Sequence, residues 1–143
     1  MFNLKLGALL AITAALAVGC SSAAAAPAPA PQGGTVSATV SDMKITLDRT
    51  SVPAGEITFV VKNSGAVVHE LVVLQTGVAQ DKIAMDMDEA GKMDETGNVG
   101  ETGDVDAGGS KTFTVTLPAG HYVLMCNEVG HYAAGMHMTF TVN

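Results

Sequence analysis

Residues 111–126, with the sequence KTFTVTLPAGHYVLMC, decide the fold class of this chain. In residues 111–117 apolar side chains alternate with threonines, which is the period of a strand with one buried face. Pro118-Ala119-Gly120 is a turn signal, and it leads into the apolar run His121–Cys126. This stretch therefore predicts two short β-strands joined by a tight turn.

The same pattern extends over residues 35–143. Runs rich in β-branched residues occupy Glu56–Lys62 and Val67–Leu74, and apolar residues alternate with threonines again in His137–Asn143. Several short strands separated by turn signals are typical of a β-sandwich or a β-barrel. We therefore expect one all-β domain, which a chain of 143 residues accommodates beside a short attachment.

Residues 77–109, the acidic excursion, interrupt the strand pattern. This segment is glycine-rich and holds nine of the fourteen acidic residues against two lysines, so it alone accounts for the net charge of −7. Ile83, Met87 and Ala90 have helical spacing, and we expect one short helix around Gln80–Ala90 with loop elsewhere. The negative charge argues against a nucleic-acid partner, because neutralising phosphates needs a basic face.

Three methionines of the excursion, Met85, Met87 and Met93, are a candidate weak docking site for Cu(I), because thioethers suit that ion. The interpretation that we favour is a charged loop in which methionine fills gaps.

Residues 1–19 are predicted to be a signal peptide. Leu6–Val18 is an apolar run of 13 residues, shorter than the roughly 20 that span a bilayer but suited to the h-region of a secretory signal. The following Ala17-Val18-Gly19-Cys20 resembles the bacterial lipobox, which implies that Cys20 is acylated and becomes the first residue of the mature protein. The alternative is an ordinary secretory signal that is cleaved later, among Ala23–Ala26.

Residues 20–34 are rich in Ala, Pro and Gly and contain no side chain able to build a core. Such a composition favours extended structure and predicts a tether on the order of 40 Å. Lipid on Cys20, a tether and a globular domain describe a protein that works at an extracytoplasmic membrane face, periplasmic or on the cell surface.

The chemistry of the chain is concentrated in residues 126–136. Cys126, His131 and Met136 follow one another at intervals of five, a spacing that a strand end and its loop can fold around one point. Thiolate, imidazole and thioether are soft donors that suit copper cycling between Cu(I) and Cu(II). A trigonal blue-copper site needs a second histidine, and His69 lies in an apolar run where a polar residue needs a reason.

With His69 on an early strand and Cys126, His131 and Met136 around the final loop, residues 35–143 resemble the cupredoxins, the small blue copper proteins. The Cys-x4-His-x4-Met spacing is most similar to the rusticyanin and sulfocyanin type. The resemblance implies a Greek-key β-sandwich, one type 1 copper ion held by these four residues, and electron transfer rather than an enzymatic reaction.

The resemblance also implies that electrons pass through the edge of His131 at the surface. The chain departs from the family at Glu70, where many members carry an Asn that braces the copper loop. This departure puts the bracing of the Cys126 sulfur, and hence the redox potential, in question.

Zinc is the nearest alternative metal, because the nitrogen and sulfur donors above, with His137, offer a closed tetrahedral set. Two features count against it. Met136 would have no role, and His137 shares strand parity with Thr139 and Thr141, on the expected solvent face.

Other chemistries are disfavoured by what the sequence contains. No Cys-x-x-Cys-His occurs, which excludes covalent c-type haem. One cysteine outside the leader cannot form a two-thiolate copper centre. The pair Cys126 and His131 has no evident third group to orient it as a nucleophile. His121 and Met125 alternate away from Leu124 and are interpreted as structural or exposed.

We therefore expect a monomeric, membrane-tethered blue copper protein that carries single electrons between redox partners, such as a basic cytochrome or a membrane oxidase. The acidic excursion is expected to steer a basic partner. An apolar shell is expected to disfavour the extra charge of Cu(II) and to give a moderately high potential; it consists of Leu71, Val73, Tyr122 and Leu124. The alternatives are a copper chaperone or buffer, and a zinc-stabilised structural domain.

Overall fold

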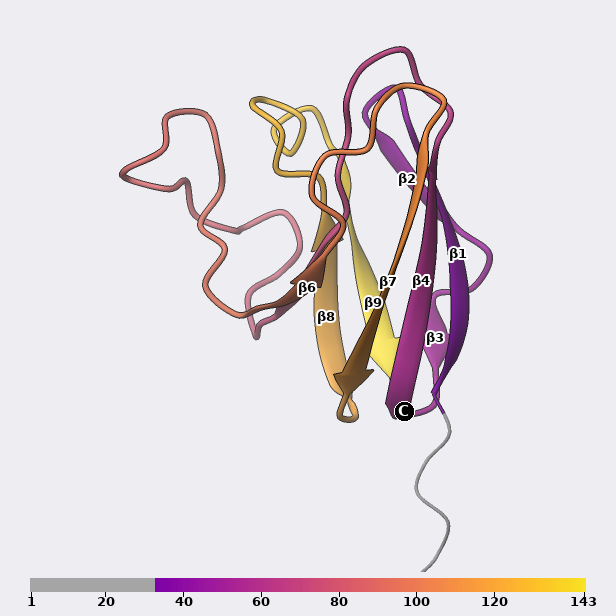
Figure 1. Ribbon diagram of the computed structural model, residues 1–143. Coiled ribbons are helices and arrows are strands. Elements are labelled where there is room, and N and C mark those ends of the chain that lie inside the picture. The colour runs from indigo at the N-terminus through magenta and orange to yellow at the C-terminus, as the bar shows by residue number, and fades with distance from the viewer. Residues whose placement is uncertain (1–32) are drawn as a thin grey trace, which may run out of the picture.

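The computed structural model describes residues 33–143, in which nine β-strands form two sheets packed face to face (Figure 1). The strands are β1 (Gly34–Ser41), β2 (Lys44–Leu47), β3 (Ser51–Val52), β4 (Gly55–Asn63), β5 (Val72–Gln75), β6 (Asn98–Glu101), β7 (Ser110–Leu117), β8 (Gly120–Met125) and β9 (His137–Val142). The predictions for residues 1–32, which include the signal peptide, Cys20 and most of the tether, lie outside the described residues.

One sheet has the strand order β2-β1-β4-β7 and the other β3-β9-β8-β5-β6. β1 pairs in parallel with β4, and β3 pairs in parallel with β9, while the other pairs are antiparallel. Both sheets are therefore mixed, and the predicted all-β sandwich is confirmed. The two strands predicted from residues 111–126 are β7 and β8. They lie in different sheets, so the turn between them crosses from one layer to the other.

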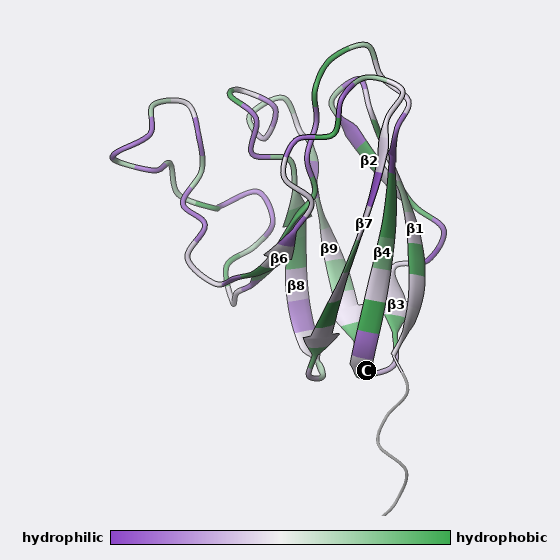
Figure 2. Cartoon of the chain, in the orientation of Figure 1, coloured by the Kyte–Doolittle hydropathy of each residue, from purple (hydrophilic) through white to green (hydrophobic). Residues whose placement is uncertain are grey.

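The main core lies between the sheets and follows from alternation along the strands. On β4, Ile57, Phe59 and Val61 are fully buried and alternate with exposed or half-buried residues. Figure 2 shows hydrophobic residues on strands of both sheets. The ring of Phe59 stacks on that of Phe113 with centroids 5.1 Å apart, and it lies 5.6 Å from the ring of Phe140. The first contact lies within the four-stranded sheet, and the second, to Phe140 on β9, ties the two sheets together.

A second, smaller core covers the outer face of the five-stranded sheet. It contains alternate residues of β5 and β8 together with two residues from beyond the sheet: Val72, Leu74, Val123, Met125, Met93 and Tyr132. Strands β5 and β8 are thus buried on both faces. His121 and Met125 were both predicted to be either structural or exposed. Met125 is buried and structural, while His121 is exposed.

The short helix predicted around Gln80–Ala90 is wrong, because the described residues contain no α-helix. The segment instead forms turns closed by a bridge between Met85 and Met93. The carboxylate of Asp86 accepts hydrogen bonds from the two backbone N–H groups that follow it at positions 88 and 89, which competes with helix formation. Met87 is 94% exposed, so the helical spacing of apolar residues has no surface to pack against.

The chain enters the sandwich at the end opposite to the final loop. β1 begins at Gly34, opposite Ile57 near the start of β4, and runs toward the loops that surround His69. The C-terminus lies at the entry end as well (Figure 1), where Asn143 donates its N–H to the carbonyl of Val52. No helix that could cross a bilayer occurs in residues 33–143.

Candidate metal centre

The loop between β8 and β9 folds back on itself and brings its two ends together. Cys126 follows directly on β8, and its backbone N–H donates to the carbonyl of Met136 at 3.1 Å, just before β9. The N–H of Met136 donates to the carbonyl of His131, also at 3.1 Å. Gly130 and Gly135 have φ of 82° and 99°, a backbone conformation that glycine tolerates best. Three predicted ligands therefore lie on one closed loop.

His69 comes from the segment between β4 and β5. Its backbone makes two hydrogen bonds with Val105, at 3.2 and 2.7 Å. The fully buried side chain of Asn63 fixes this segment, because its Nδ2 donates to the carbonyls of Val67 at 2.7 Å and Val105 at 2.8 Å. Gly65 leaves room for the imidazole, since a Cβ there would lie 3.1 Å from His69 Nε2.

The structure brings three of the four predicted ligands to one point. His69 Nδ1 lies 3.2 Å from His131 Nδ1, and Cys126 Sγ lies 3.4 Å from His131 Nδ1 and 3.9 Å from His69 Nδ1. His69 and Cys126 are fully buried, while His131 is partly exposed. The centre is therefore closed toward the core and open to the surface only along one imidazole.

These separations fit a single metal ion. With metal–nitrogen distances of about 2.0 Å and a metal–sulfur distance of about 2.3 Å, donors in a trigonal plane lie roughly 3.5 to 3.7 Å apart. The three observed separations, 3.2, 3.4 and 3.9 Å, bracket that range. Two imidazoles and one thiolate are also the trigonal donors of a blue-copper site. The arrangement therefore suits copper in both geometry and donor chemistry.

The fourth predicted ligand, Met136, is fully buried in the same core cluster as Cys126. Three of the predicted shell residues, Leu71, Val73 and Leu124, are also fully buried in that cluster. Water is thus excluded from the core side of the centre.

Burial controls the protonation of the ligands before a metal binds. Burial, and next the neighbouring His131, lower the pKa of His69, which keeps its imidazole neutral and able to donate a lone pair. Burial raises the pKa of the Cys126 thiol to about 11. A protonated thiol is a poor nucleophile, so the burial of Cys126 argues against a Cys126–His131 nucleophilic pair. A metal ion displaces the thiol proton when it binds.

Glu70, the residue at which the chain departs from the family pattern, braces the centre twice. Its backbone N–H donates to Cys126 Sγ at 3.4 Å, and its Oε1 accepts a hydrogen bond from the backbone N–H of Asn127 at 3.1 Å. Glu70 is only 8% exposed. Burial, followed by repulsion from Glu95 and other carboxylates, raises its pKa to about 7. The backbone of residue 70 therefore braces the sulfur, and its carboxylate braces the residue that follows Cys126.

His137 does not join the centre. The ring lies on the predicted outward face but is half-buried against Tyr132, with ring centroids 4.6 Å apart. The reason is that Tyr132, in the loop, covers this end of β9. Among the described residues, the metal-ligating group around Cys126 contains only His69 and His131 besides it. A closed zinc site therefore lacks its fourth nitrogen or sulfur donor.

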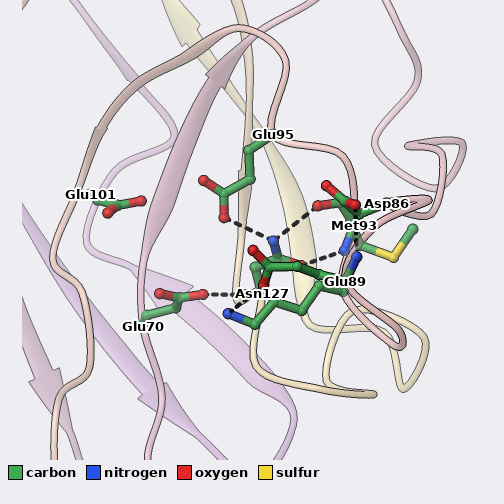
Figure 3. Close-up of a pocket in the computed structure, with 8 residues that line it drawn as sticks. Glu70, Asp86, Glu89, Met93, Glu95, Glu101 and Asn127 are labelled. Carbon is green, nitrogen blue, oxygen red and sulfur yellow. Dashed lines mark hydrogen bonds and ion pairs between the residues drawn. The ribbon is translucent and has the colours of Figure 1, made fainter.

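An acidic pocket of about 300 Å³ adjoins the centre on the side of the excursion (Figure 3). Its charged lining residues are five carboxylates and one lysine: Glu70, Asp86, Glu89, Glu95, Glu101 and Lys92. The lysine is paired with Glu89 at 3.5 Å. Because Glu70 follows His69 directly, the negative charge begins one residue from the metal ligands.

The sequence interpretation missed Asn63, Asn127 and Tyr132. Each uses its side chain to hold a ligand-bearing segment through backbone groups. Asn127 is a polar residue directly after an apolar strand, which was the only local signal for it.

A model of the protein family described as "Cupredoxin-like domain" matches residues 9–142. No match was found among curated proteins.

Solved structures give the same family of folds. A reduced auracyanin from Roseiflexus castenholzii is 29% identical, with a TM-score of 0.59, over 76% of this chain and 96% of that one. Auracyanin A from Chloroflexus aurantiacus, described as a "blue" copper protein, is 21% identical, with a TM-score of 0.54, over 77% and 100%. Rusticyanin from Thiobacillus ferrooxidans is 19% identical, with a TM-score of 0.61, over 76% of each chain.

Proposed function

The chain belongs to the cupredoxin-like domain family, and from that premise we propose that it carries single electrons between redox proteins at an extracytoplasmic membrane face. The observation that carries the proposal is the convergence of Cys126 Sγ with the Nδ1 atoms of His69 and His131, all three within 4.8 Å of one another. One copper ion held there supplies one-electron exchange between Cu(I) and Cu(II).

The residues around the centre favour fast electron exchange. Cys126, His69 and His131 are positioned by backbone hydrogen bonds that do not depend on the ion, so either oxidation state meets the same donor geometry. Met136 would supply the fourth and weakest donor, its thioether sulfur. The buried apolar residues on the core side restrict water and disfavour the extra charge of Cu(II), which supports a moderately high potential.

The surface near the centre favours a basic partner. His131 is the ligand that reaches solvent, and the acidic pocket begins at Glu70 and Asn127, which directly follow the ligands His69 and Cys126. We assign the imidazole edge of His131 as the route for electrons and the carboxylates of the excursion as the group that steers a basic cytochrome or a membrane oxidase toward it. Attachment to the membrane is assigned to lipid on Cys20 with residues 20–34 as the tether.

The test is a Cu(II) titration of the full-length chain in detergent, followed by optical absorption and EPR, with Cys126→Ser as the matched variant. An intense blue thiolate-to-copper band and a small parallel hyperfine splitting, both absent from the variant, are the expected result. A pale complex that is indifferent to Cys126 would contradict the electron-carrier proposal. It would leave the copper buffer as the better explanation.

Steering by the excursion is tested with two small inorganic oxidants of opposite charge and similar size. We expect the rate with the cationic oxidant to fall as ionic strength rises, and the rate with the anionic oxidant to rise. The double variant Asp86→Asn, Glu89→Gln should reduce the ionic-strength dependence of both rates. Rates that do not respond to ionic strength would contradict the assignment of the excursion.

A further inference from the structure

The acidic excursion does more than add charge, because it is hydrogen-bonded to the loop between β8 and β9, residues 126–136, which we call the ligand loop. Three contacts join the two segments, at Asn127, at Gly130 and at Tyr132. All three lie between the ligands Cys126 and Met136. The excursion therefore touches the part of the loop that carries the metal ligands.

The first contact is the side-chain amide of Asn127, which pairs with the backbone of Met93 like a strand neighbour. Its Oδ1 accepts from the N–H of Met93 at 2.7 Å, and its Nδ2 donates to the carbonyl of Met93 at 3.0 Å. Nδ2 also donates to Oε1 of Glu95 at 2.8 Å (Figure 3). Asn127 is 2% exposed, so these hydrogen bonds are shielded from competing water.

The second contact is the phenol of Tyr132. Its hydroxyl donates to the carbonyl of Gln80 at 2.7 Å and accepts from the N–H of Ile83 at 2.9 Å. The ring is buried in the second core against β5 and β8. Tyr132 directly follows the ligand His131, so the hydroxyl anchors the chain one residue from the exposed imidazole.

The third contact joins the tips of the two segments. The N–H of Gly130 donates to the carbonyl of Gly91 at 3.2 Å. The approach is close, because a Cβ at Gly91 would lie 2.7 Å from Cγ1 of Val129. Residues 80–95 thus lie along the ligand loop over most of its length.

We propose that Asn127 and Tyr132 are positioning residues for the copper centre, which clamp residues 80–95 of the excursion onto the ligand loop and thereby hold the Cys126 sulfur and the His131 ring in place. The path from the clamp to the sulfur is continuous. The Asn127 amide binds Met93, the Asn127 N–H binds the Glu70 carboxylate, and the Glu70 N–H binds Cys126 Sγ.

The clamp acts on the apoprotein as well as on the loaded centre. A loop of about ten residues is entropically costly to fix in one conformation, and here residues 80–95 share that cost by packing over it. Because the donors are then held before the ion arrives, copper binding does not have to order the loop. The proposal rests on the proposed function only in that copper is the ion bound.

The decisive variants are Tyr132→Phe and Asn127→Asp. Phenylalanine keeps the buried ring and removes only the hydroxyl. Aspartate keeps the shape of Asn127 but loses both Nδ2 hydrogen bonds and faces the Glu95 carboxylate. Adding Glu95→Gln to Asn127→Asp replaces that repulsion by a new donor, so the double variant should recover part of the loss.

The matched control is Tyr122→Phe. The Tyr122 hydroxyl also donates to a backbone carbonyl, that of Pro118, at 2.7 Å, and its ring is also buried. It lies at the opposite end of β8 from the ligand loop. It therefore reports the cost of losing a buried tyrosine hydroxyl without touching the clamp.

Three measurements separate positioning from simple stability. In the metal-free protein, amide hydrogen exchange over residues 80–95 should become roughly thirtyfold faster in Tyr132→Phe, since two hydrogen bonds of about 1 kcal/mol each are lost. In the copper form, release to a chelator should accelerate by a similar factor. The redox potential should fall, because a looser loop admits water that favours Cu(II).

We expect Tyr122→Phe to lower the melting temperature but to leave the hydrogen exchange of residues 80–95 in the metal-free protein at the wild-type rate. The proposal is overturned if Tyr132→Phe and Asn127→Asp behave in the same way. A wild-type protein without a blue copper spectrum would instead reject the proposed function, while the hydrogen-exchange comparison in the metal-free protein would still test the clamp.

Discussion

Glu70 and Cys126 are joined by a hydrogen bond from the Glu70 N–H to the Cys126 sulfur, 3.4 Å long. The carboxylate of the same residue accepts a hydrogen bond from Asn127, the next residue after the cysteine. One residue therefore fixes both the sulfur and the start of the ligand loop. Because the backbone makes the first bond, many side chains could supply it, but the second requires an acceptor of the right length.

The buried carboxyl of Glu70 should make the stability of the metal-free protein depend on pH. Its pKa in the folded protein is raised from 4.5 to about 7, so between these values the folded state binds more protons than the unfolded state. The free energy of unfolding therefore falls as pH rises through that window, by at most about 3 kcal/mol. Chemical denaturation between pH 4.5 and pH 8 measures this fall.

Glu70→Gln removes the titrating group. As pH rises, the free energy of unfolding of the wild type should therefore fall relative to that of the variant. Glu56→Gln, on an exposed position of β4, is the control and should run parallel to the wild type. Parallel curves for Glu70→Gln as well would show that this carboxyl titrates normally.

Gly65→Ala should weaken copper binding without unfolding the domain. The added Cβ would lie 3.1 Å from His69 Nε2 and 3.2 Å from Ser41 Cα, so the imidazole must shift. Disturbing a group that supports a ligand typically costs 10-fold to 100-fold in metal affinity, and we expect about tenfold here by competition with a chelator. Gly77→Ala, where no atom lies within 4 Å of the added Cβ, should bind copper normally.

Asn63→Ala should destabilise the protein more than any exposed asparagine does. The substitution leaves the carbonyls of Val67 and Val105 without their side-chain donor in a buried site, at a cost of about 2 to 4 kcal/mol in the free energy of unfolding. Asn98→Ala serves for comparison, because its bonds to Glu95 and Glu101 are exposed. Equal denaturation midpoints for the two variants would contradict the role given to Asn63.

Met136→Leu should keep the blue colour and raise the redox potential. Leucine nearly conserves the buried volume, so the cost in stability should stay below about 1.5 kcal/mol. It removes the weak thioether donor that stabilises Cu(II) and that tunes the potential of such sites. Met138→Leu, a partly buried position on β9, should leave the potential unchanged. A potential that does not respond to Met136→Leu would remove this residue from the ligand set.

The sequence was sufficient for the features that depend on local pattern. Alternation in residues 111–117 predicted a strand with one buried face, and the intervals of five between Cys126, His131 and Met136 predicted a loop folded around one point. Cys126 and His131 do meet, because a strand end and a closed loop leave them few other arrangements, and His69 joins them from the segment between β4 and β5.

What the sequence could not predict depends on contacts between distant segments. Met125 and His137 belong to outward-facing positions of their strands, yet the first is buried and the second half-buried, because Tyr132 and Met93 cover that face. The helix predicted from the spacing of Ile83 and Met87 is absent because of another contact between distant segments. The N–H of Ile83 is already bound by the Tyr132 hydroxyl, 49 residues away in the chain.

β1, which pairs in parallel with β4, runs from one end of the sandwich to the other and so separates the chain entry from the metal centre. The chain enters at Gly34, about 20 Å of extended strand from the end of β1 beside Gly65, and the metal centre lies at that far pole. Under the attachment proposed above, the pole that faces the bilayer carries the chain entry and the C-terminus, while the exposed imidazole and its acidic surroundings face outward. Membrane anchoring and partner docking would then occupy opposite poles, so the protein could exchange electrons without leaving the membrane surface.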